Sequence, residues 1–146
     1  MGRLNVKEYL NQANCLERRI KILKREIEKM RILSTSTSAV KYDGERVQSS
    51  GPSDPLAVTV TNIIEREEYL AELIKQYIEK KELLESQITM MDNEFFSDVL
   101  YGKYVAGLSF FDLAYQIGKE RRQTIRIHNK AVTAFREQYK NFFENL

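Results

Sequence analysis

Basic side chains gather in one short stretch near the end of the chain. Four of them fall within eight residues, and a fifth follows one helical turn later: Lys119, Arg121, Arg122, Arg126 and Lys130. DNA attracts such residues because binding releases the counterions condensed on its phosphates. An arginine can donate two hydrogen bonds to guanine, and a glutamine can form two with adenine. The stretch therefore has the chemistry of DNA recognition.

Helical spacing assigns different contacts to these residues. Arg122 and Arg126 are four residues apart and share one face of a helix, so we expect them, with Gln123, to contact base edges. Phosphate contacts position a protein without reading sequence. The candidates for phosphate contacts are Lys119, Arg121 and Lys130. A solvated basic face with no ligand is the alternative interpretation.

The segment around the basic cluster predicts two helices joined by a tight turn. Ser109 is placed to cap the first helix, and Gly118 supplies the positive φ that ends it. Apolar or small residues follow at helical spacing on both sides of that turn. They are Leu113, Ala114, Ile117, Thr124, Ile127, Ala131, Val132 and Phe135. This layout predicts a helix-turn-helix whose second helix lies in the major groove.

The same segment resembles two families. From Ser109 to Arg136 it is similar to region 4 of bacterial sigma factors, although Lys119 replaces an apolar residue and Glu120 replaces a capping Ser or Thr. The RRQ-x-x-R-x-H stretch, together with the N-terminal segments, resembles small phage proteins related to late-gene transcriptional regulators of the ArpU type. That resemblance implies a phage-type, sequence-specific transcriptional regulator that activates late genes. Host RNA polymerase is a further candidate partner.

Charge is segregated along the 146 residues, although the net charge is only +2. Residues 1–33 hold nine basic and four acidic residues, whereas residues 63–98 hold four basic and ten acidic residues. Residues 99–146 are again basic, with eight against four. A basic helix, an acidic helix and a basic C-terminal domain therefore follow one another, which is typical of a protein that binds nucleic acid.

Two hydrophobic seams predict long coiled-coil helices over residues 1–33 and 57–91. The first seam alternates steps of four and three residues: Tyr9, Ala13, Leu16, Ile20, Leu23, Ile27 and Met30. Asn5 and Glu8 form a possible capping box at its start. The second seam consists of Ile63, Leu70, Ile74, Tyr77, Leu84, Ile88 and Met91. It skips two positions, which are occupied by Glu67 and Lys81. Opposite charges favour antiparallel pairing in one chain, while pairing between chains, or a four-helix homodimer of two hairpins, stays open.

The segments between and after the seams complete the predicted organisation. Residues 34–56 are rich in Ser, Thr, Gly and Pro, which indicates a flexible linker, or alternatively a docking segment that uses Arg46. Residues 92–146 form the helix-turn-helix domain. Its supporting helix spans residues 92–106, capped by Asp92 and ended by Gly107. Its core candidates, with the aromatic pair that follows them, are Phe95, Phe96, Val99, Leu100, Tyr104, Phe110 and Phe111.

Other classes of function find little support in the sequence. His128 is the only histidine and is expected at the surface or beside phosphate, and Cys15 is the only cysteine, which fits a reducing cytoplasm. We therefore expect no metal, no cofactor, no catalytic residue and no enzyme. No apolar run reaches the roughly 18 residues of a membrane span, and no signal peptide is visible.

The sequence thus predicts an all-α protein: a long helical hairpin or coiled coil followed by a C-terminal helix-turn-helix domain. The expected ligand is double-stranded DNA, bound by a cytoplasmic homodimer that regulates transcription. Two other functions stay open. One is a DNA-packaging, small terminase-like subunit. The other is a helical module that binds RNA polymerase or a host factor, with the basic helix incidental.

Overall fold

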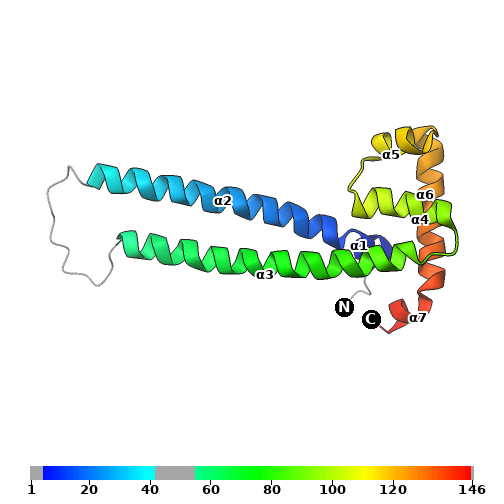
Figure 1. Cartoon of the computed structure of the whole chain (residues 1–146), viewed down its shortest axis with the longest axis horizontal. Coiled ribbons are helices and arrows are strands. Elements are labelled where there is room, and N and C mark those ends of the chain that lie inside the picture. Colours follow the sequence, from blue (N-terminus) through cyan, green and yellow to red (C-terminus); the bar gives the residue numbers. More distant parts are fainter. Residues whose placement is uncertain (1–4, 42–54, 146) are drawn as a thin grey trace. The chain divides into compact units, whose positions relative to one another are not determined.

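The computed structural model describes residues 5–41 and 55–145, and within them it contains helices and no strand. The all-α prediction is confirmed. The helices follow one another along the chain (Figure 1): α1 Val6–Leu10, α2 Gln12–Lys41, α3 Pro55–Thr89, α4 Glu94–Leu100, the π-helical turn η1 Tyr101–Val105, α5 Phe110–Ile117, α6 Arg121–Gln138 and α7 Lys140–Glu144.

The chain divides into two compact units. The hairpin unit spans Glu17–Gln76, and the terminal unit combines the chain up to Leu16 with the chain from Tyr77 onward. Helices α2 and α3 each contribute residues to both units. This division differs from the predicted segments 1–33, 34–56, 57–91 and 92–146. The start of the first predicted helix belongs to the same unit as the C-terminal helices.

In the hairpin unit, α2 and α3 of the same chain lie side by side (Figure 1). Ile20, Leu23 and Ile27 of the first seam are buried, as is Leu73 of α3, which the second seam omitted. Arg66 forms an ion pair with Glu26 at 3.2 Å, and Arg31 forms one with Glu67. Exposed pairs of this kind contribute only about 0–1 kcal/mol each. Apolar burial therefore holds the helices together, while the ion pairs favour the observed pairing of a basic with an acidic helix.

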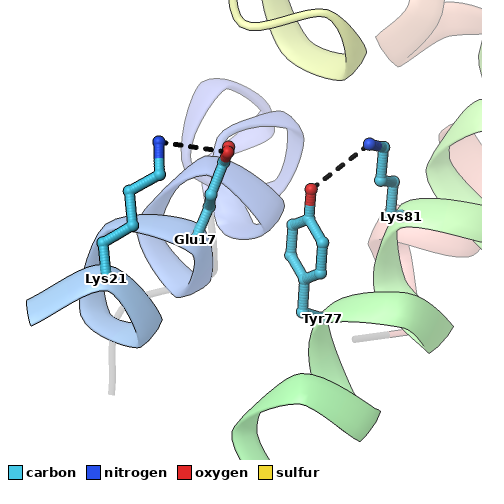
Figure 2. Close-up of polar contacts among 4 residues, drawn as sticks. All are labelled: Glu17, Lys21, Tyr77 and Lys81. Carbon is cyan, nitrogen blue, oxygen red and sulfur yellow. Dashed lines mark hydrogen bonds and ion pairs between the residues drawn. The ribbon is translucent and has the colours of Figure 1, made fainter. Parts of the chain in front are cut away.

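Two polar pairs on the long helices join residues one helical turn apart (Figure 2). In the hairpin unit, Lys21 Nζ lies 3.4 Å from a carboxylate oxygen of Glu17, one turn earlier. In the terminal unit, Lys81 Nζ donates a hydrogen bond to the Tyr77 hydroxyl at 3.2 Å. Lys81 holds one of the positions that the second seam skips. Its half-buried stem can pack along the helix while its charge meets a polar partner.

The predicted linker is shorter than expected at both ends. Helix α2 continues to Lys41 and α3 begins at Pro55, so residues 34–41 and 55–56 are helical. The hydroxyls of Thr35 and Thr59 donate to carbonyls one turn earlier, which lets such residues stay in a helix. Proline is also well suited to the first helical position. The remainder of the linker, including Arg46, lies outside the described residues.

The core of the terminal unit joins the first helix to the last ones. The buried residues come from α1, the end of α3, α4, η1 and α6: Tyr9, Leu10, Leu84, Ile88, Met91, Leu100, Tyr104, Ala131, Val132 and Phe135. The Tyr9 ring packs edge-on against Phe142 and Phe143, and its hydroxyl donates to Gln87 Oε1 at 2.5 Å. Helix α1 therefore stabilises the C-terminal helices.

Side chains that follow α3 in the sequence donate hydrogen bonds to the carbonyls at its end. The last carbonyls of a helix have no partner within it. Here Ser97 donates to the carbonyl of Ile88 at 2.8 Å, and Tyr139 donates to that of Gln87 at 2.6 Å. Gln138 donates to the carbonyl of Met90 at 3.0 Å. These bonds tie α4 and α6 to α3 and fix the scaffold on which α6 is presented.

The supporting helix differs in detail from the prediction. Asn93, not Asp92, caps α4, because its side-chain oxygen accepts from the amide of Phe96 at 3.1 Å. The helix then widens into the π turn η1, after which Gly107 adopts a positive φ of 72°. Val99, Leu100 and Tyr104 are buried as expected. Phe95 and Phe111, however, are exposed, so only one member of each aromatic pair packs inward.

Candidate nucleic-acid interface

Local chemistry determines where α5 begins and ends. The Ser109 hydroxyl accepts from the amide of Asp112 at 3.1 Å, which satisfies one of the unpaired donors at the start of the helix. At the other end, Gly118 adopts φ 67° and ψ 34°, and the amide of Lys119 donates to the carbonyl of Ala114 at 3.0 Å. The predicted cap and the predicted glycine turn are both confirmed.

Helix α6 begins directly after this turn, with Glu120 as its N-cap. The Glu120 side chain makes no capping hydrogen bond, whereas the Thr124 hydroxyl donates to the Glu120 carbonyl at 2.9 Å. Thr124 is completely buried, in agreement with its predicted inward position. The turn thus closes through backbone and threonine contacts, and the Glu120 carboxylate is left exposed.

The inner face of α6 includes a residue that we expected outside. Its buried positions are Thr124, His128, Ala131, Val132 and Phe135. Ile127, predicted as an inner residue, is only half-buried. The spacing from Thr124 to His128 to Phe135, four and then seven residues, would have indicated the correct face.

His128 is buried, with 3% of its surface exposed, and it is held on three sides. Its Nε2 lies 2.6 Å from the Tyr104 hydroxyl, its Nδ1 lies 3.2 Å from Asn129 Oδ1, and the Phe110 ring meets it edge-on at 5.1 Å. Burial lowers the pKa of His128 below its usual value, and the nearby charges of Lys7 and Lys103 act in the same direction, against the Asn129 hydrogen bond. The predicted surface position of His128 is therefore wrong.

All six predicted DNA-binding residues are exposed. Lys119 lies in the turn, and the other five lie on α6: Arg121, Arg122, Gln123, Arg126 and Lys130. None of the six forms an ion pair with another described residue. The cationic groups are therefore not neutralised within the described part of the chain.

The helical spacing of α6 distributes these side chains over three positions. Arg122 and Arg126 project from the side opposite the buried positions, which we call the outer face. Gln123 and Lys130 are seven residues apart and share one flank of the helix, and Gln123 also neighbours Arg126 at three residues. Arg121 lies three residues before buried Thr124, at the edge next to the turn. Sequence reasoning missed Asn129 and Thr133, which are exposed and continue the outer face.

Neither a metal-binding cluster nor a membrane-spanning helix occurs among the described residues. No group of three or more His, Cys, Asp or Glu side chains there is arranged to hold a metal ion. None of the described helices combines the length and apolar character needed to cross a membrane.

No protein-family model matches the chain, and no significant match is found among curated proteins or solved structures. These comparisons therefore add no support to the resemblance to ArpU-type regulators, which stays a prediction.

Proposed function

We propose that the chain is a sequence-specific DNA-binding protein in which α5, the Gly118 turn and α6 act as a helix-turn-helix. The observation that carries the proposal is the outer face of α6. Arg122 and Arg126 project there into solvent, while Thr124, His128 and Phe135 anchor the opposite side in the core. An α-helix fits the major groove of B-DNA, and arginine is the residue most often used there to read guanine.

Electrostatics favour the same surface. Residues 99–146 carry eight basic and four acidic residues, and five of the basic residues lie between 119 and 130. Lys119, Arg121 and Lys130 are exposed outside the outer face and are the candidates for phosphate contacts. Each phosphate contact would contribute to affinity and to its dependence on salt.

The biological role rests on the family resemblance. We propose a phage-type regulator that activates transcription of late genes in the bacterial cytoplasm, with RNA polymerase of the host as a second partner. The resemblance of the RRQ-x-x-R-x-H stretch to ArpU-type regulators supports this part, while the exposed basic helix supports DNA binding alone.

The hairpin unit supports the proposal of a homodimer. Several large apolar side chains of this unit remain exposed in the single chain: Ile22, Ile32, Val58, Val60, Ile64 and Tyr69. A second copy would remove part of this surface from water, and two copies of α6 would read two half-sites. Light scattering of the purified chain tests this point. A dimer agrees with the proposal, whereas a ring of many subunits would favour a DNA-packaging subunit.

The same exposed apolar residues favour one alternative, a module that binds another protein through the hairpin unit. In that case the basic helix is incidental. The two functions differ in one measurable respect, because only the first requires tight and selective binding of duplex DNA through α6.

Selection of bound sequences from a random duplex pool, followed by affinity measurements, tests the proposed function. Arg126→Ala should weaken binding to the selected duplex by about 1–3 kcal/mol, and binding to a scrambled duplex much less. Lys130→Ala should weaken binding to both duplexes alike and reduce the salt dependence. Recovery of no preferred sequence, or identical behaviour of the two variants on both duplexes, would contradict the proposal.

A further inference from the structure

Asn129 occupies a position on α6 that has no assigned role. It is exposed, and it follows Arg126 by three residues and Arg122 by seven. Residues at these intervals share one face of a helix. If α6 enters the major groove as proposed, the Asn129 amide faces the same groove as the two arginines.

The Asn129 side chain is linked to the core by hydrogen bonds. Its Oδ1 lies 3.2 Å from Nδ1 of buried His128, and Nε2 of the same ring lies 2.6 Å from the hydroxyl of buried Tyr104. An amide oxygen can only accept a hydrogen bond. His128 Nδ1 therefore carries the proton and donates it to Asn129, so Nε2 of the neutral ring accepts from the Tyr104 hydroxyl. A continuous series of hydrogen bonds runs from the core to the surface.

This series orients the exposed amide. With Oδ1 held by His128, the two hydrogens on Nδ2 have no acceptor among the described residues. One lone pair of Oδ1 also remains available, because a carbonyl oxygen can accept twice. Adenine offers N7 as an acceptor and the N6 amino group as a donor on its major-groove edge. An oriented asparagine amide matches this pair of groups.

We propose that Asn129 reads an adenine in the major groove, and that His128 and Tyr104 are positioning residues that hold its amide in the reading orientation. The inference rests on the proposed function of α6. A preset amide loses less rotational freedom on binding than a mobile one, so its contact with the base is stronger. Two buried side chains thus contribute to the base specificity of an exposed one.

The experiment compares variants of the full chain on the selected duplex and on duplexes in which each base pair is changed in turn. Asn129→Ala should lose discrimination at one A·T pair by about 5- to 150-fold, the range of a two-hydrogen-bond contact, and keep it at the other pairs. Asn141→Ala, which removes an exposed amide from α7, is the matched control and should behave as the wild type.

The positioning role is tested by a double-mutant cycle with Tyr104→Phe, which deletes only the hydroxyl. Tyr104→Phe should reduce discrimination at the same A·T pair, and it should cause no further loss when Asn129 is already alanine. If the loss is equal in both backgrounds, Tyr104 acts through general stability and the positioning role is overturned. Nitrogen NMR shifts of the His128 ring should also report the proton on Nδ1, and a proton on Nε2 would contradict the orientation.

Failure of this inference and failure of the proposed function give different results. If Asn129→Ala keeps the full preference at every pair while Arg126→Ala loses it at one, the adenine contact is overturned and the proposed function stands. If the wild type itself has no preferred duplex, both are overturned.

Discussion

The hydroxyl of Tyr104 lies 2.6 Å from Nε2 of His128, with both side chains buried between η1 and α6. The bond joins the supporting turn to the helix that we propose for DNA reading. Because the partner on α6 is a histidine, the packing of this helix depends on a side chain that becomes positively charged when it binds a proton.

Stability should therefore fall as the solution becomes mildly acidic. Burial holds the pKa of folded His128 below its unfolded value of 6.5, so the unfolded chain binds a proton more readily. Stability is fully present above pH 6.5 and is lost as the pH falls from there toward the folded pKa. Urea unfolding at pH 7.5 and pH 5.5 measures the loss.

His128 is the only histidine, so the control for this measurement is a single substitution. His128→Gln keeps a polar side chain without a titrating ring, and its stability should change less between the two pH values. An equal loss in the wild type and in His128→Gln would show that other groups cause the pH dependence.

Gly118 should tolerate substitution only at a conformational cost. Its φ of 67° lies in the left-handed region, and a Cβ placed there would meet no atom within 4 Å. Gly118→Ala should therefore destabilise the fold by about 1–2 kcal/mol through backbone strain alone. Gly118→Asn should cost less, because asparagine tolerates this region better. Thermal unfolding distinguishes them, and an equal cost for both would argue against a strain effect.

Glu120 is an unfavourable residue at its position. Replacing it should increase both the stability of α6 and the affinity for DNA. The N-cap makes no side-chain hydrogen bond, so Glu120→Ser should stabilise α6 by about 0.5–1 kcal/mol. Loss of a negative charge beside the basic cluster should also tighten DNA binding, with a weaker gain at high salt. Glu120→Ala removes the charge without adding a cap, and should therefore share the gain in affinity but not the gain in stability.

Features determined by neighbouring residues were predictable from the sequence. The caps at Asn5 and Ser109, the glycine turn at Gly118 and the seam of α2 all depend on residues within one or two helical turns. Helical periodicity and side-chain chemistry are sufficient to recognise such features. The exposure of Arg122, Gln123, Arg126 and Lys130 follows from the same periodicity.

Features determined by distant residues were not predictable. The spacing of α6 places His128 on its inner face, but it does not reveal the buried Tyr104 hydroxyl that satisfies the ring. Leu73 is buried in the hairpin unit although the second seam omits it. The packing of α1 with α6 joins opposite ends of the chain. Such contacts depend on the tertiary arrangement.

The central claim is that the outer face of α6 binds duplex DNA. Its most direct test is the affinity of the double variant Arg122→Ala, Arg126→Ala for the selected duplex, at one fixed salt concentration. The control is Lys24→Ala, Arg25→Ala, which removes the same charge from exposed residues of α2. The account predicts that the α6 variant loses about 2–6 kcal/mol of binding free energy, the sum of two base contacts, while the control stays close to the wild type. Unchanged affinity of the α6 variant, or an equal loss in the control, would contradict the claim.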